Sequence, residues 1–104
     1  MQPVESSIEI IRQAIRERKM LEFQYHSLPR IVEPMRLGQV KRGIWELRAH
    51  QISGKSASGR VADGTPKLFT VAEMADISIL PISFEVPIFY ERVDTTFIHV
   101  DTEL

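Results

Sequence analysis

The sequence has no cysteine, only three histidines, and no apolar run that approaches the roughly 20 residues a membrane-spanning helix needs. The absence of cysteine excludes disulfides, thiolate metal sites and a cysteine nucleophile, and it fits a reducing compartment. His26, His50 and His99 lie far apart, and none has a second histidine or a carboxylate at a ligand-like spacing within one element. Because the first residues also lack the basic and then apolar pattern of a signal peptide, we expect a cytoplasmic protein without a metal site.

The motifs of common enzyme classes are absent as well. The chain contains no G-x-S-x-G, no P-loop and no G-x-G-x-x-G that opens a helix. The glycine-containing segment 54–64 lacks the strand-to-helix setting of a phosphate-binding loop. Four late carboxylates are interpreted as solvated charges: Glu91, Asp94, Asp101 and Glu103. We therefore expect no catalytic residues, no cofactor and a protein that is not an enzyme.

Composition and charge indicate one globular domain whose two halves differ in charge. At 104 residues, with 43% hydrophobic and 26% charged residues, the chain is long enough for one domain and has the make-up of a folded protein. Its net charge is −1, yet residues 1–60 carry eleven basic and six acidic side chains, whereas residues 61–104 carry two and eight. This difference allows a local basic face but does not indicate nucleic-acid binding by the chain as a whole.

The opening segment, residues 6–19, is predicted to form an amphipathic helix. Ser6 and Glu9 have the capping-box spacing, in which each side chain satisfies a free backbone N–H at the helix start. Apolar residues recur on one face, which predicts that this face packs against the rest of the chain: Ile8, Ile11 and Ile15.

From Met20 the hydrophobic period changes to two, which is typical of half-buried strands. Leu21, Phe23 and Tyr25 alternate with polar residues, and a turn near residue 28 leads into a second extended segment. Pro34 lacks an N–H for the ladder, so that second strand is predicted to be an edge, or to bend or bulge there.

The third predicted strand, after a turn at residues 41–43, has the clearest alternation. Its inward set is predicted to be Trp45, Leu47 and Ala49. Its opposite face is polar: Glu46, Arg48 and His50. Residues 51–66 then break the pattern and are predicted to form a long loop. Residues 67–71 are predicted to form another strand, residues 77–80 a last barrel strand that Pro81 closes, and the tail from residue 83 either adds strands or docks on a neighbour.

Together these elements predict an α+β fold that is mainly β with one N-terminal helix. The expected architecture is a five-stranded SH3/Sm-like small barrel with the indole of Trp45 in its interior. Residues 1–104 are expected to form a single domain, with the helix over about 6–19, the barrel over about 20–81 and a C-terminal extension over about 82–104.

The order of the elements resembles a WYL domain over residues 8–90. Typical members have a helix, a strand that ends in an aromatic residue, an Arg-x-x-x-Pro segment, a Trp-Tyr-Leu triplet and a basic-x-Phe-x-aliphatic strand. The matching pieces here are Ala14-Ile15, Phe23-x-Tyr25, Arg30-Ile31-Val32-Glu33-Pro34, Trp45-Glu46-Leu47 and Lys67-Leu68-Phe69-Thr70-Val71. The resemblance implies a regulatory sensor with an Sm-like barrel, of the kind that accompanies winged-helix DNA-binding domains in bacterial transcription factors.

This resemblance implies that the chain binds an anionic ligand, either a nucleotide or single-stranded nucleic acid, on a basic face of the barrel. Guanidinium forks pair with phosphate, and aromatic rings stack on bases. Arg30 and Lys67 match basic positions of the family. The other candidate ligand-binding residues are Tyr25, Glu46, Arg48, His50 and Arg60.

Two departures from the family leave a second hypothesis open. Glu46 stands where the family has the tyrosine of its triplet, and Glu73 stands where it often has arginine. Both would oppose phosphate if they lined the pocket, and Lys67 lacks the bidentate fork of arginine. The alternative is a protein–protein interaction or oligomerisation module that has lost the ligand pocket, and whose acidic tail and strand edges pair with a partner chain or a second copy.

Overall fold

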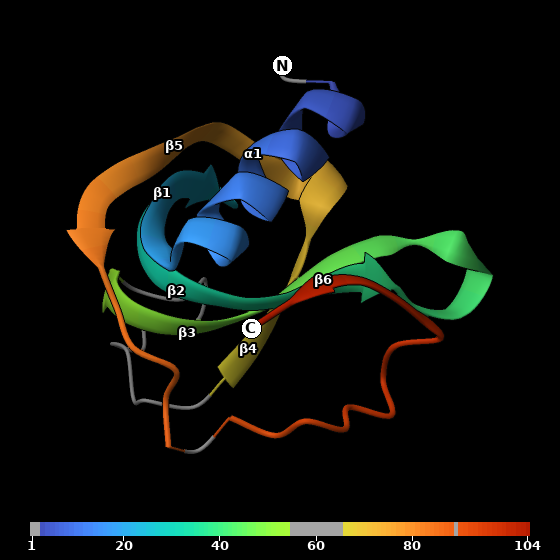
Figure 1. Cartoon of the computed structure of the whole chain (residues 1–104). Coiled ribbons are helices and arrows are strands. Elements are labelled where there is room, and N and C mark those ends of the chain that lie inside the picture. Colours follow the sequence, from blue (N-terminus) through green and yellow to red (C-terminus); the bar gives the residue numbers. More distant parts are fainter. Residues whose placement is uncertain (1–2, 55–65, 89) are drawn as a thin grey trace.

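The computed structural model describes residues 3–54, 66–88 and 90–104, and consists of one helix packed on a strongly curved antiparallel sheet (Figure 1). Helix α1 spans Val4–Glu17. Two short 3-10 turns, η1 (Lys41–Gly43) and η2 (Val71–Glu73), connect strands. The six strands are β1 (Lys19–Tyr25), β2 (Leu28–Gln39), β3 (Trp45–Gly54), β4 (Pro66–Thr70), β5 (Met74–Ser83) and β6 (His99–Glu103). The predicted class, mainly β with an N-terminal helix, is confirmed.

The sheet is open, so closure into a five-stranded barrel is not confirmed. Its strand order is β4-β3-β2-β1-β5, and β6 also pairs with β2. One edge of β2 is shared by β1, along residues 28–32, and by β6, along residues 36–39, while β3 takes the other edge. Over the residues that the structure describes, no ladder joins β4 to β5, and only η2 links these two edge strands.

Helix α1 packs its apolar face onto the sheet. In Figure 1 the helix crosses in front of the strands. The hydrophobic spacing explains this, because residues three and four apart fall on one side of a helix. The face is buried, as predicted: Ile8, Ile11 and Ile15. No helix in the described ranges is long and apolar enough to cross a membrane.

The two ends of α1 differ from the predicted bounds. The helix begins at Val4, so Ser6 and Glu9 lie inside its first turns and the predicted capping box is wrong. The N-cap is Pro3, which makes no side-chain cap, and Glu9 forms an ion pair with Arg12 instead. At the other end Arg18 adopts the left-handed conformation (φ 53°), which stops the helix before the predicted Lys19.

The core lies between α1 and the inward face of the sheet, and the alternation within the strands supplies most of it. The inward prediction is confirmed for Leu47 and Ala49, which have no exposed surface. Trp45 is only half-buried: its indole packs against the edge of the core and lines a surface groove with Val4 and Ile8. Because Trp45 is the first residue of β3, the sheet covers it on one side only, and the predicted interior position is wrong.

A bulge in β2 decides which residues of this strand face the core. Pro34 pairs with Ala49, and the next pair is Arg36 with Arg48, so Met35 has no partner in β3. β2 is therefore an interior strand with a bulge, not an edge. Since successive residues alternate between faces, one extra residue moves Arg36 to the outward face.

Two predicted boundaries after β3 are also wrong. β3 continues to Gly54, so residues 51–54 belong to a strand, and the rest of the predicted loop, residues 55–65 with Arg60, lies outside the described residues. β5 continues through Pro81 to Ser83. Among the described strands it pairs only with β1, and a proline is tolerated on an edge strand.

Candidate anion-binding site

Arg30 on β2 carries a positive charge inside the curved sheet. Only 3% of its surface is exposed. It pairs across the ladder with Phe23, whose side chain belongs to the core, and so shares the inward face. Its Nη1 donates to Gln51 Oε1 and its Nη2 donates to the backbone oxygen of Tyr25, both at 3.2 Å.

Aromatic rings enclose this guanidinium. Its carbon Cζ lies 5.4 Å from the ring centre of Tyr25 and 6.0 Å from that of Phe69. These two rings meet edge to face at 5.0 Å, and Phe23 packs edge to face on both. Cation–π contacts of this kind contribute about 0.5–2 kcal/mol each. We refer to Arg30, Gln51, Tyr25 and Phe69 as the Arg30 cluster.

Within the described part of the chain, the charge of Arg30 has no carboxylate partner. Over the described residues no acid lies within ion-pair distance of it, and two buried donors, Arg30 Nε and Gln51 Nε2, have no acceptor. Burial lowers the pKa of Arg30 because the charged form loses its hydration, and the electrostatic contribution of Tyr25 acts in the opposite direction. A buried cation beside two unused donors is an arrangement that a bound anion would satisfy.

The register of the sheet divides the predicted ligand-binding residues between two faces. Tyr25 belongs to the Arg30 cluster, and Lys67 lies opposite Ala49, which places it on the same inward face. Three of the predicted residues share the outward face instead: Glu46, Arg48 and His50. The single basic face that we predicted therefore does not form.

The outward residues already have partners or the wrong charge for an anion. Arg48 Nε donates to Asp94 Oδ2 at 3.0 Å, and His50 Nδ1 lies 3.0 Å from Glu33 Oε1. Glu46 buries its Oε2 atom without a hydrogen-bond partner. The basic side chains on this face lie next to carboxylates, and Glu46 adds a further negative charge. The outward face is therefore the weaker candidate for an anionic ligand.

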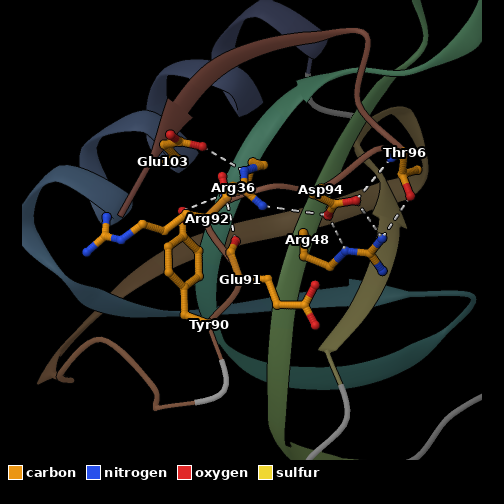
Figure 2. A network of polar contacts seen from close by, with 8 residues as sticks. All are labelled: Arg36, Arg48, Tyr90, Glu91, Arg92, Asp94, Thr96 and Glu103. Carbon is orange, nitrogen blue, oxygen red and sulfur yellow. Dashed lines mark hydrogen bonds and ion pairs between the residues drawn. The ribbon is translucent and has the colours of Figure 1, made fainter.

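Residues 90–104, which we call the C-terminal segment, cover the part of the outward face around Arg36 and Arg48 and add β6 to the edge of β2 (Figure 2). Its anchor is Arg36, whose side chain is 3% exposed. Arg36 Nε donates to Glu103 Oε2 at 2.7 Å, and Nη2 donates to Tyr90 Oη at 2.8 Å and to the Glu91 backbone oxygen at 2.9 Å. Asp94 lies 3.7 Å from Arg36 Nη1 and bridges it to Arg48.

Three of the late carboxylates that we interpreted as solvated are bound to arginines of the first half of the chain. They are Asp94, Asp101 and Glu103. A hydrogen bond from Arg12 is the main reason that the pKa of Asp101 falls to about 2. Burial alone would raise the pKa of Asp94, but hydrogen bonds and the charge of Arg48 lower it overall. The charge difference between the two halves thus serves internal pairing.

A cavity of about 320 Å³ opens between the C-terminal segment and the outward face. Its lining contains Met35, Arg36, Arg48, Pro66, Glu91 and Asp94. Both arginines are already paired with Asp94, so the cavity holds no uncompensated charge of the kind found at Arg30. Within the described ranges, no three metal-ligating side chains lie close enough together to hold a metal ion.

Sequence reasoning missed two members of the Arg30 cluster and the anchor of the C-terminal segment. Gln51 continues the inward alternation of Leu47 and Ala49 by one more period, and this signal was available. Phe69 lies in the matched Lys67–Val71 strand, but nothing local marks it as a neighbour of Arg30. Arg36 has no local signal, because its outward orientation depends on the bulge at Met35.

Comparison with known proteins supports the fold. No protein-family model matches the sequence, and a search of curated proteins finds no significant match. Among solved structures, the proteasome accessory factor B/C (PafBC) of Arthrobacter aurescens is similar, with a TM-score of 0.64 and 22% sequence identity. The match covers 88% of this chain but only 14% of that one. The chain therefore shares its fold with one segment of a much longer protein.

Proposed function

We propose that this chain is a WYL-like regulatory module of the cytoplasm that senses an anionic ligand through the Arg30 cluster and is not an enzyme. The ligand class is a nucleotide or single-stranded nucleic acid. The observation that carries the proposal is a guanidinium that is 3% exposed and has no carboxylate partner among the described residues, whose own Nε and the neighbouring Gln51 Nε2 are both buried without an acceptor there. The fold that the chain shares with a segment of the proteasome accessory factor PafBC supports the regulatory part.

The chemistry of the cluster fits a phosphate attached to an aromatic base. Phosphate oxygens accept charge-assisted hydrogen bonds. Arg30 Nε and Gln51 Nε2 could donate such bonds, because neither has an acceptor among the described residues. The rings of Tyr25 and Phe69 supply apolar surface beside the guanidinium. Lys67 on the same inward face adds a second positive charge.

The two acidic departures from the family lie at different places relative to the Arg30 cluster. Glu46 faces outward, away from the cluster, so the repulsion of phosphate that the sequence indicated does not apply to it there. Glu73 is exposed on η2, where its Oε1 lies 2.6 Å from His26 Nε2, and the ring of His26 stacks on that of Tyr25. The charge of Glu73 is therefore shared with His26 beside the cluster.

Fluorescence anisotropy with a labelled oligonucleotide of about eight nucleotides tests the proposal, with adenosine monophosphate and inorganic phosphate as competitors. In Arg30→Met the side-chain volume is nearly kept while the charge and donors are lost. We expect binding about 10- to 100-fold weaker, because a charge-assisted hydrogen bond contributes about 1.5–3 kcal/mol. Lys67→Met should weaken binding less than Arg30→Met does. It should also lower by about one the number of counterions released on binding, which is measured as the slope of log affinity against log salt concentration.

Arg16→Met is the matched control, since Arg16 is exposed on α1 and carries the same charge. This variant should bind like the unmodified protein. Equal losses in Arg16→Met and Arg30→Met would show that only net charge matters, and the site would be refuted. Competition by the mononucleotide at the same concentration as the oligonucleotide would identify a nucleotide sensor; competition only by the oligonucleotide would identify a nucleic-acid sensor.

A further inference from the structure

Ion pairs hold the C-terminal segment to the rest of the chain, in addition to the ladder between β2 and β6. Three arginines from α1, β2 and β3 each bind one of its acids: Arg12 with Asp101, Arg36 with Glu103, and Arg48 with Asp94. The first contact is a two-pronged fork, with Arg12 Nε to Oδ2 at 2.7 Å and Nη2 to Oδ1 at 2.8 Å. Such forks fix the orientation of a segment as well as its position.

The outward face of β2 is also shaped for this segment. A Cβ atom added to Gly38 would lie 2.3 Å from the His99 backbone oxygen and 2.9 Å from the ring of Phe97. Only glycine leaves room for the close approach of β6 and for Phe97, which is 8% exposed. Residues 36–39 of β2 and the C-terminal segment are therefore complementary in shape, charge and backbone pairing.

The same part of the chain leaves apolar side chains in water. Ile88 is fully exposed, and Val93 and Ile98 keep 74% and 72% of their surface exposed. The stretch from Phe84 to Ile98 forms no helix or strand among its described residues, so few backbone contacts tie it to its own chain. A segment with a well-built docking face, an irregular connection and exposed apolar residues has the features of an exchangeable element.

We propose that two copies of this chain exchange their C-terminal segments, so that residues 90–104 of each copy dock on β2 of the other. Every contact of the segment is kept in the exchanged dimer, since the docking faces are identical. The two connections then run past each other, and the exposed Ile88 of each connection can cover the exposed Val93 and Ile98 of the docked segments. The linked segment competes at an effective concentration of about 1 mM, so without this apolar gain half of the protein would be exchanged only near that concentration.

A disulfide trap detects the exchange without altering the ion pairs. Gln39 and His99 are cross-strand partners of β2 and β6, and the chain has no cysteine of its own. Gln39→Cys combined with His99→Cys gives a monomer after oxidation if the segment docks on its own chain, and a covalent dimer if it docks on a second copy. We expect the dimer band to grow from about 0.01 to 1 mM protein before oxidation.

The two single cysteine variants are the controls, because neither can form the cross-link between β2 and β6. A dimer band in the double variant beyond that of both controls supports exchange. If the oxidised double variant runs as a monomer at every protein concentration, the proposal is overturned.

A charge-swap mixture provides an independent test. Arg12→Asp and Asp101→Arg each place like charges in contact within one chain, but an exchanged pair of the two variants restores an opposite-charge contact at both docking faces. After equal amounts are warmed together and cooled, native mass spectrometry should detect mainly the heterodimer.

Mixing Arg16→Asp with Asp101→Arg is the matched control, because an exchanged pair of these two variants keeps like charges at one docking face, so its heterodimer should be no more abundant than the exchanged dimer of the unmodified protein. Equal amounts of heterodimer in the two mixtures, or none in either while circular dichroism shows both variants folded, would overturn the proposal.

Discussion

Replacing the buried charge at Arg30 should make the protein more stable. Removing a buried ion relieves a desolvation cost of several kcal/mol, and each buried donor without an acceptor costs about 1–3 kcal/mol. Against this, Arg30 makes two hydrogen bonds at 3.2 Å, each contributing about 1.5–3 kcal/mol. Arg30→Met combined with Gln51→Leu removes both unused donors together and fills the same volume. We expect the free energy of unfolding to rise by about 1–3 kcal/mol.

Thermal and urea unfolding followed by circular dichroism measure this change. For a chain of this size the gain corresponds to a melting temperature higher by about 5–15 °C. The single variants should each be less stable than the double variant, because Arg30→Met leaves the Gln51 amide buried without a partner and Gln51→Leu leaves Arg30 without its acceptor. Arg16→Met, an exposed charge removal, should change stability by no more than about 0.5 kcal/mol.

A double variant less stable than the unmodified protein would refute the reasoning. That result would mean that the protein compensates the charge of Arg30 without any ligand. The complementary measurement adds adenosine monophosphate: ligand binding should raise the melting temperature of the unmodified protein and leave that of the double variant unchanged. The two results together separate a binding site from a merely tolerated buried arginine.

Three further outcomes follow from the contacts. The pKa of Asp101 is lowered from 3.8 to about 2, so its pairing with Arg12 stabilises the fold above pH 4, and this stabilisation is lost as the pH falls toward 2. The urea concentration at the midpoint of unfolding should therefore fall less between pH 5 and pH 2 in Asp101→Asn than in the unmodified protein. Gly38→Ala should destabilise by about 1–3 kcal/mol, since its Cβ would meet the His99 oxygen, whereas a neutral result in urea unfolding would contradict the close approach. Tyr25→Phe should cost about 1 kcal/mol in the same assay, because its Oη accepts a backbone hydrogen bond from β4 at 3.0 Å; unchanged stability would mean that this bond contributes nothing.

Local patterns predicted most of the secondary structure because each depends on residues close in sequence. The alternation of Leu21 and Phe23 required one buried face of a strand, and the spacing of Ile8, Ile11 and Ile15 required one buried face of a helix. Boundaries were less predictable. The capping-box spacing of Ser6 and Glu9 was present, but the helix began earlier.

The candidate site was predicted in part, because its residues are distant in sequence. Arg30 and Tyr25 were identified through the family resemblance, and both belong to the Arg30 cluster. Arg48 was assigned to the same surface, but the register of β3 with β2 turns it outward, where Asp94, 46 residues away, binds it. No pattern within one element shows which acid will meet which arginine.

The sequence by itself determined the elements and their buried faces: one amphipathic helix, then strands whose side chains alternate with a period of two. Only the tertiary structure decided how charges are shared. The bulge at Met35 turned Arg36 outward to meet the C-terminal segment, and the fold brought Asp101 to Arg12 across 89 residues. The physical reason is that hydrophobic periodicity acts within a few residues, whereas the pairing of a charge depends on every segment that reaches it. No acid of the residues that the structure describes reaches Arg30, and this made it the candidate site.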